Sequence, residues 1–241
     1  MEAFDRSAKG RIRYRTVVNH RVRLATATRA PVHWRPIAWG LVSSNSWPGH
    51  ETTRRVVVST DGKVRLVQTR WDRGRPLRVQ VTRLLGRIYP GRLVAVADRY
   101  LYWVARGGVL RRAIWTRSGL IRKVTLPVTI RRATAITAVE TAHGKRLYYT
   151  TKAGALHVVR DNGGRSADVV LRSSGYAGVI GLRADLCLSA SYGGYNPPVG
   201  LLSVRNGVAR YQRVLRPAAG DGGSLTKATR VRSTWSWRRL G

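Results

Sequence analysis

Tryptophan stands beside arginine at several places along this sequence, and such pairs can bind sugars or nucleotides. The segments are HWRPIAW (33–39), RWDRGR (70–75), RRAIWTR (111–117) and STWSWRR (233–239). An exposed indole offers a flat apolar face to a sugar ring or a base, while a guanidinium binds phosphate or sulfate oxygens. The same pattern also arises in a strand that points tryptophan inward and arginine outward, because side chains alternate between its two faces.

From these pairs and from other clusters of arginine we predict two sets of binding residues. The residues predicted to stack against a ligand are Trp34, Trp71, Trp115 and Trp235. The residues predicted to bind a polyanion are Arg11, Arg13, Arg15, Arg111, Arg112, Arg131, Arg132, Arg238 and Arg239. Arginine suits this role because its planar fork contacts two phosphate or sulfate oxygens at once.

Carboxylates recur where an apolar strand ends, at Asp61, Asp98, Glu140 and Asp185. A pair of carboxylates at the centre of a ring of strands is the arrangement that glycoside hydrolysis needs. Aspartate at a turn between strands also stabilises the turn by bonding its own backbone, and this is the role we expect. Ser59 begins a sialidase-type motif that lacks its second glycine and its tryptophan. The sequence therefore predicts a non-enzymatic protein with no catalytic residues.

Metal and cofactor motifs are missing from the sequence. The five histidines show no pair at ligand spacing within one predicted element, and Cys187 is the single cysteine. A lone cysteine excludes an internal disulfide framework and a cysteine-based zinc site, and we expect it to be a buried apolar side chain. No nucleophile elbow or phosphate-binding glycine loop is present. We therefore predict neither a metal nor a cofactor.

Positive charge is spread along the whole chain. There are 45 Lys and Arg residues against 11 Asp and Glu, which gives a formal net charge of +34. A compact domain with this imbalance repels itself unless anions are nearby. The predicted partner is therefore a polyanion, either nucleic acid or an anionic glycopolymer, with an acidic protein surface as another possibility. No apolar run reaches the length of a membrane span, and the first residues lack the apolar core of a secretory signal. The cytoplasm or a larger particle is favoured.

The segments LYWVARGGVL (101–110) and LYYTTKAGAL (147–156) align without a gap. Related segments begin near Val22, Val64 and Leu186, so that successive repeats start 36–46 residues apart. Repeats of this length that are built from short strands are typical of propeller blades. We predict that each repeat holds an apolar strand such as 56–59 or 93–97, a turn, the quoted aromatic strand, a glycine turn, a third strand and a more polar fourth strand.

The predicted fold is an all-β, single β-propeller of five blades, each of about 40–48 residues. Residues 1–10 are predicted to be an N-terminal extension and 11–241 the propeller domain. We expect RIRYRTV (11–17) to pair with STWSWRRLG (233–241) and close the ring, because each strand would otherwise leave an exposed edge. A β-sandwich would not explain a 40-residue repeat, and two stacked barrels would need a linker that is not seen near the middle of the chain.

The repeated pattern resembles the tachylectin-like five-bladed β-propeller lectins. The residues that carry the resemblance are Leu101, Tyr102 and Trp103 with Gly108 and Leu110, and Lys145 to Tyr149 with Gly154 and Leu156. The family's Gly-Gly-Trp loop helps to form its amino-sugar pockets, and its nearest counterparts here are residues 162–165 and 193–195. The resemblance implies a propeller and, through it, sugar binding.

Three functions follow from these patterns. The first is a non-enzymatic propeller that binds a polyanion, including as a structural component of a larger assembly. The second is a lectin with repeated sugar pockets, and the third is an adaptor that docks other proteins on its rim. The first is favoured, because the charge extends over the whole folded body and is not confined to a tail.

Overall fold

A computed structural model describes residues 2–6, 11–18, 21–29, 36–47, 50–59, 61–72, 78–88, 93–163, 165–186, 197–217 and 219–231. Regular structure in these ranges is β-strand, apart from the short 3-10 helix η1 (Arg106–Gly108). Among the described residues no helix is long and apolar enough to cross a membrane. Branched and aromatic residues favour the strands, because they pack well on a pleated surface.

The described strands form five antiparallel sheets, which we call A to E. Sheet A holds β1 (Glu2–Arg6), β2 (Arg11–Val18) and β3 (Arg21–Arg29). Sheet B holds β4 (Pro36–Trp47), β5 (His50–Ser59), β6 (Lys63–Asp72) and β7 (Arg78–Arg87). Sheet C holds β8 (Val94–Ala97), β9 (Tyr100–Val104), β10 (Val109–Thr116) and β11 (Gly119–Thr129). Sheet D holds β12 (Ala133–Thr141), β13 (Gly144–Thr151), β14 (Leu156–Asp161) and β15 (Ser166–Arg172). Sheet E holds β16 (Val179–Leu186), β17 (Val199–Arg205), β18 (Val208–Leu215), β19 (Ser224–Leu225) and β20 (Thr229–Arg230).

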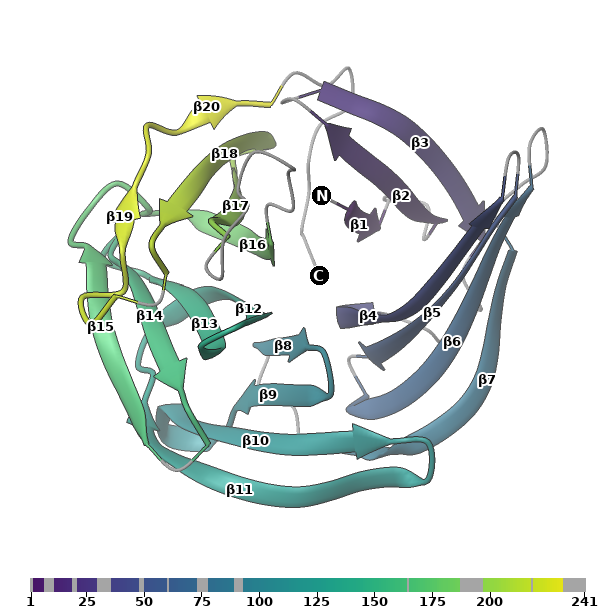
Figure 1. The fold of residues 1–241 in the computed structure, drawn as a ribbon, viewed down its shortest axis with the longest axis horizontal. Helices are drawn as coiled ribbons and strands as arrows, with labels where there is room; N and C mark the ends of the chain where they lie inside the picture. The colour runs from purple at the N-terminus through teal and green to yellow at the C-terminus, as the bar shows by residue number, and fades with distance from the viewer. Residues whose placement is uncertain are drawn as a thin grey trace.

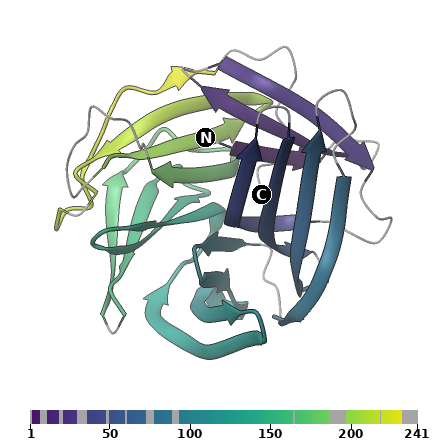
Figure 2. The ribbon, with the colours of Figure 1, turned by 45° about the vertical axis from the view of Figure 1, so that its right-hand side comes forward.

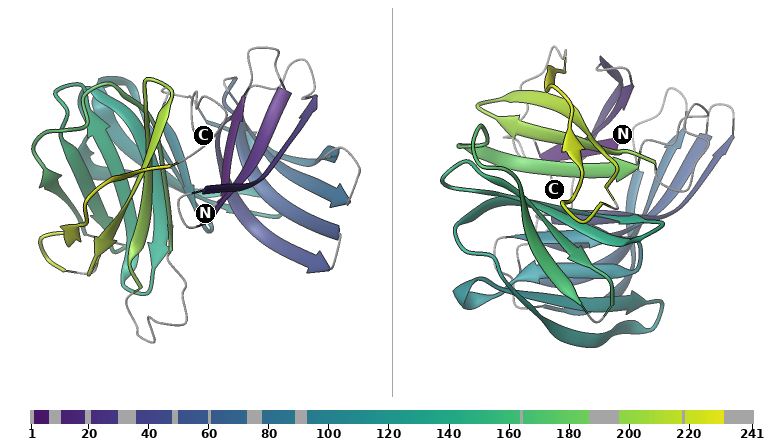
Figure 3. Two further views of the ribbon diagram at one scale, coloured as in Figure 1. Left: turned by 90° about the horizontal axis from the view of Figure 1, so that it is seen from above. Right: turned by 60° about the vertical axis from the view of Figure 1, so that its left-hand side comes forward.

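The sheets stand in chain order around a common centre (Figure 1). The first strand of each sheet lies at its inner edge, and β4, β8, β12 and β16 contact one another in sequence around the ring. Figure 2 shows the strands of sheet B side by side, and Figure 3 shows sheets A and B opposite sheets D and E. The prediction of an all-β propeller is confirmed. Sheets B, C and D have four strands, sheet E has five and sheet A has three.

The core lies between neighbouring sheets, because each middle strand buries both of its faces. In β9, Leu101 and Trp103 pack towards sheet B, whereas Tyr102 packs towards sheet D. In β13, Leu147 packs back against sheet C and Tyr148 packs forward against sheet E. The two aligned segments are therefore the second-to-third-strand hairpins of adjacent sheets, as predicted, and their shared residues form the inter-sheet core.

Several local predictions need correction. Residues 56–59 belong to the second strand of their sheet, because β4 precedes them at the inner edge. Residues 2–6 of the predicted extension form β1, which pairs with β2 in the first sheet. The segment 11–17 has β1 on one side and β3 on the other, so it has no free edge with which to close the ring. Its predicted partner 233–241, like Cys187, lies outside the described residues.

Candidate functional site

The turns of the ring gather at two ends, because antiparallel strands place successive turns at opposite ends of a sheet. One end is formed by the turn at 61–62, where Asp61 pairs with Lys63 and Arg65, and by segments 105–108, 130–132, 152–155, 173–178 and 205–207. We call the last five segments the basic end. Backbone hydrogen bonds join these turns across sheets. Ile130 N donates to Gly108 O at 2.7 Å, and Lys152 N donates to Arg132 O at 2.8 Å. The turns of sheets C and D are therefore one connected surface.

Glycine allows this close approach between the turns. Gly108 has φ 84°, and a Cβ atom there would lie 2.7 Å from the carbonyl oxygen of Ile130. Gly154 has φ 93°, and a Cβ atom there would lie 2.8 Å from the amide nitrogen of Ala177. Both positions combine a left-handed backbone with a lack of space, and glycine alone tolerates the two together.

The basic end has no acidic side chain in its five turn segments. Its cationic residues are exposed, and none of them is in an ion pair within the part of the chain that the structure describes. They are Arg106, Arg131, Arg132, Lys152 and Arg205. Uncompensated charges gathered at one end create a positive potential that attracts anions.

The opposite end carries both signs of charge, and some of its cations, such as Arg112 and Lys145, are paired with acidic residues. Asp161 lies at the end of β14, where its side chain is 1% exposed. Arg112 Nη1 donates to Asp161 Oδ2 at 2.6 Å, and Tyr102 Oη donates to the same oxygen at 2.8 Å. This contact joins sheet C to sheet D. Burial, followed by the charge of Asp161, raises the pKa of Tyr102, so the phenol keeps its proton and remains a donor.

A second cluster at this end brings together Asp98, Glu140 and Lys145. Burial raises the pKa of Glu140, a hydrogen bond and the charge of Asp98 raise it further, and Lys145 opposes the shift. Lys145 Nζ lies 3.6 Å from Glu140 Oε1 and 4.0 Å from the centre of the Tyr100 ring. This cluster links the ends of β8 and β12, the first strands of sheets C and D.

The recurrence of carboxylates holds only in part. Asp98 follows the first strand of sheet C, and Glu140 and Asp185 lie near the ends of the first strands of sheets D and E. Asp61 instead follows the second strand of sheet B, at the other end of the ring. There it accepts a hydrogen bond from Lys63 N at 3.0 Å and stabilises the turn, which is the expected role.

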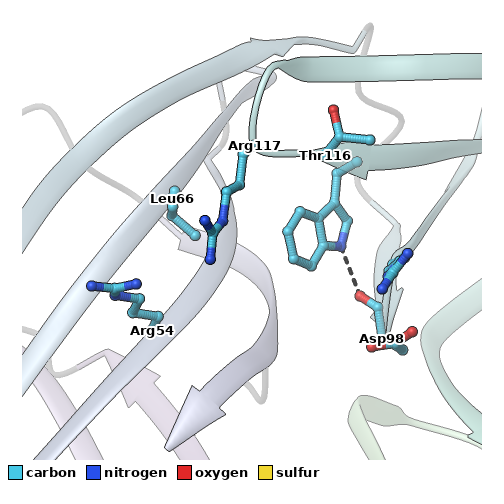
Figure 4. A pocket seen from close by; sticks show the side chains of 7 residues that line it. Arg54, Leu66, Asp98, Thr116 and Arg117 are labelled. Carbon is cyan, nitrogen blue, oxygen red and sulfur yellow. Dashed lines mark hydrogen bonds between the residues drawn. The ribbon is translucent and has the colours of Figure 1, made fainter.

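A pocket of about 400 Å³ lies between sheets B and C at the mixed-charge end. Figure 4 shows Arg54 and Leu66 on the side of sheet B, with Thr116 and Arg117 on the side of sheet C. Asp98, Arg99 and Trp115 complete the lining. The indole Nε1 of Trp115 donates to Asp98 O at 2.7 Å, which holds the ring against the β8–β9 turn.

The predicted binding residues do not form one site. Arg131 and Arg132 lie at the basic end, Arg111 is exposed on β10, and Arg112 is committed to its pair with Asp161. Trp115 is 8% exposed and presents only part of its ring to the pocket. Residues in described strands whose side chains are not described are Arg11, Arg13, Arg15 and Trp71. Residues outside the described ranges are Trp34, Trp235, Arg238 and Arg239.

Other charged residues of these surfaces were not predicted from the sequence. They are Arg205 at the basic end, Arg54, Arg99 and Arg117 at the pocket, and Asp161 between sheets C and D. The described residues contain no group of three or more His, Cys, Asp or Glu side chains arranged to hold a metal ion.

Comparison with known proteins finds similarity in structure alone. No protein-family model matches the chain, and no curated protein matches it in sequence. A fungal lectin from Aleuria aurantia, described as a six-bladed propeller with a novel mode of fucose recognition, superposes with a TM-score of 0.53 at 12% identity. The match covers 95% of this chain and 73% of the lectin. The chain has the β-propeller fold.

Two further solved structures agree with this assignment. A mutant of AofleA from Arthrobotrys oligospora gives a TM-score of 0.53 at 11% identity and covers 95% of this chain and 81% of that one. A mutant of the Aleuria lectin in complex with Fucα1-6GlcNAc gives 0.52 at 12% identity and covers 98% and 80%. Identities this low show the fold alone. The fold-level resemblance to propeller lectins is confirmed, although the lectins found are fungal and the Aleuria lectin is described as six-bladed.

Proposed function

We propose that the protein is a non-enzymatic β-propeller binding protein whose basic end engages a polyanion, either nucleic acid or an anionic glycopolymer. The observation that carries this proposal is the set of five exposed cationic side chains at the basic end, whose five turn segments contain no carboxylate. At the other end of the ring, by contrast, Arg112 and Lys145 are paired with acidic residues. Unpaired cations are available to a ligand, whereas paired ones are already neutralised.

Arginine and lysine on the turns suit a regular array of anionic groups. Each contact that neutralises a phosphate or sulfate releases counter-ions, so affinity falls steeply as salt is added. Contacts of this kind depend on the charge and spacing of the anionic groups and do not distinguish one base sequence from another. The proposed activity is therefore binding with little sequence preference, as expected of a component of a larger assembly.

The test measures the affinity for duplex DNA, RNA and heparin between 50 and 200 mM salt by fluorescence anisotropy. The double variant Arg131→Gln/Arg132→Gln is expected to weaken binding and to reduce the salt slope by about one for each phosphate or sulfate that is no longer neutralised. The matched control is Arg122→Gln/Lys123→Gln, an adjacent pair of exposed cations on the outer strand β11. If none of the three polymers binds at low salt, or if both double variants weaken binding equally, the basic end is not the binding surface.

A lectin is the second candidate, and the fold similarity to fucose-binding propellers favours it. Shallow sugar sites gain avidity when several act together. A glycan array read at moderate salt separates the two functions, because a neutral-sugar lectin keeps its signal while a charge-dependent binder loses it.

A further inference from the structure

Two arginines of sheet D lie side by side on the face of the sheet that packs against sheet E. Arg146 of β13 is directly opposite Arg160 of β14 in the antiparallel pairing. Side chains alternate between the two faces of a strand, and Tyr148 and Val158, two residues away in each strand, pack against sheet E. The Cβ atoms of directly opposite residues are about 4.5–5.5 Å apart. The two guanidinium groups therefore start from adjacent positions on one face.

Both arginines contact the segment between β18 and β19 of sheet E. Arg146 Nε donates to Pro217 O at 2.9 Å. A Cβ atom at Gly220 would lie 4.0 Å from Arg160 Nη1, so this guanidinium group also reaches the segment. The two cations therefore meet the same short stretch of sheet E, at the end of the ring where β13 begins and β14 ends.

Neither cation has an acidic partner among the residues that the structure describes. The side chain of Arg146 is buried, with 2% of the residue exposed, and its hydrogen bonds all go to uncharged oxygens, which are Pro217 O, Lys145 O and Asn162 Oδ1. Arg160 makes no hydrogen bond or ion pair with a described residue, and its Nε is buried. Arginine keeps its proton even when buried, so this pair retains two positive charges that repel one another.

The electrostatics of Arg146 show that this repulsion is felt. Burial lowers the pKa of Arg146, and the charge of Arg160 lowers it further, against an opposing effect of Tyr148. An uncompensated charge in the interior is costly unless an opposite charge or hydrogen-bond acceptors stabilise it. A buried donor without a partner often marks the place of an ion or a water molecule. The pair therefore lacks an acceptor with negative charge.

The acidic residues nearest to the pair in sequence do not supply this charge. Asp161 follows Arg160 directly, but it points to the opposite face of sheet D, where it pairs with Arg112. Asp221 lies in the segment between β18 and β19, where it is exposed and accepts a hydrogen bond from Gly223 N at 2.9 Å. It forms no ion pair with any described residue.

The free donors of the pair suit an oxyanion that arrives from solvent. Arg160 is partly exposed, and Arg146 Nη2 has no partner among the described residues and is not sealed from solvent. A guanidinium group binds two oxygens of one phosphate or sulfate at once, which a chloride ion cannot offer. We propose that Arg146 and Arg160 together bind one oxyanion, a phosphate or sulfate group, between sheets D and E.

This site is separate from the surface that we propose for polyanion binding. The start of β13 and the end of β14 lie at the opposite end of the ring from the turns at 105–108, 130–132 and 152–155. Either proposal can therefore fail without the other.

The test is titration calorimetry of the full chain with sodium sulfate and with sodium phosphate, in chloride buffer of constant ionic strength. One saturable site with a Kd below about 1 mM is expected. Arg160→Gln is expected to weaken this binding by about tenfold or more, because it removes charge-assisted hydrogen bonds. In buffer without either oxyanion, the melting temperature of Arg160→Gln should equal or exceed that of the unsubstituted protein, because the substitution relieves the repulsion between like charges.

The matched control is Arg122→Gln, which removes an exposed arginine of β11 and is expected to leave the binding unchanged. The proposal is overturned if neither oxyanion fills a saturable site, or if the two variants weaken binding equally. A lower melting temperature of Arg160→Gln in oxyanion-free buffer would also contradict it, since Arg160 would then be stabilised by the protein itself.

Methyl phosphate distinguishes the two sources of such a group. Affinity equal to that of inorganic phosphate supports a site for a phosphate group carried by a larger molecule. Loss of binding supports a site for the free ion, because the methyl group then prevents entry between the sheets.

Discussion

We expect the Asp161→Ala variant to lose about 3–5 kcal/mol of unfolding free energy, the range for removing one partner of a buried ion pair. Asp161 is 1% exposed, and its carboxylate accepts hydrogen bonds from Arg112, Tyr102 and the backbone of Gly163. The Arg112 side chain is itself only 11% exposed. Alanine would leave the buried phenol of Tyr102 without an acceptor and would leave Arg112 without its counter-ion, with only the Gly163 carbonyl oxygen at 3.5 Å from its Nη2.

The size of this loss of unfolding free energy follows from the buried groups that the substitution leaves unpaired. An unpaired buried donor costs about 1–3 kcal/mol, and an unpaired buried charge costs more. In a chain of this size, 1 kcal/mol corresponds to about 2–4 °C in melting temperature, so a shift of about 6–20 °C is expected. The loss of stability should raise the unfolding rate or lower the folding rate. It should not change the slope of the unfolding free energy against denaturant concentration, because the area exposed on unfolding is the same.

The assay is urea denaturation followed by tryptophan fluorescence and circular dichroism. The control is Asp61→Ala, which removes an exposed carboxylate from surface pairs with Lys63 and Arg65 and should cost about 1 kcal/mol or less. Equal losses in the two variants would refute the argument that burial decides the cost.

A double substitution gives a second check on the same reasoning. Asp161→Leu with Arg112→Met removes both charges together, and such replacements of buried pairs are often neutral or stabilising. The double variant should therefore be more stable than Asp161→Ala. If it is less stable, an unpaired Arg112 is not the reason for the cost of Asp161→Ala, since both variants remove the acceptor of Tyr102.

Three further outcomes are expected. Gly108→Ala should lower the melting temperature, because it combines a left-handed backbone with a Cβ atom 2.7 Å from a carbonyl oxygen, and such strain costs about 1–3 kcal/mol. Tyr148→Phe should leave stability unchanged or raise it, since that buried hydroxyl has no partner among the described residues, whereas Tyr102→Phe should lower it by about 1–3 kcal/mol. Asp98→Asn should lower the pKa of Glu140 in a carboxyl carbon NMR titration, because it removes a neighbouring negative charge.

The raised pKa of Glu140 also makes the stability of the protein depend on pH. The native state holds the proton of Glu140 more tightly than the unfolded chain, so the contribution of this residue is present below its ordinary pKa of 4.5 and declines as the pH rises towards the raised value. In Asp98→Asn this decline should be smaller. An unchanged pKa would show that burial alone raises it. An unchanged melting temperature in Gly108→Ala, or equal losses from the two tyrosine substitutions, would contradict the contacts described for those residues.

Local pattern was enough to predict the strands and the kind of fold. Residues 101–104 are all apolar or aromatic, so the strand buries side chains on both of its faces, and the same pattern returns in 147–149. A repeat of about 40 residues with strand periodicity leads to propeller blades, because each sheet needs another on both sides to cover its faces. The hairpins at 105–108 and 152–155 follow from their glycines.

The position of a strand within its sheet, counted from the inner edge, could not be predicted from the sequence in the same way. Residues 56–59 look like the start of a repeat, yet β4 lies before them at the inner edge of sheet B. A short apolar segment carries no mark that separates an inner strand from the next one out. For this reason Asp61 was grouped with Asp98, although the two lie at opposite ends of the ring.

The sequence by itself determined the excess of positive charge, the strand content and the repeat. Only the tertiary structure decided where the charge is left uncompensated. Asp161 neutralises Arg112 across 49 residues of sequence, while the turns that hold Arg106, Arg132 and Lys152 meet through backbone hydrogen bonds and contain no acidic residue themselves. The physical reason is that pairing between charges depends on which turns and sheets become neighbours, and packing between sheets sets those neighbours at distances in the chain that no local pattern encodes.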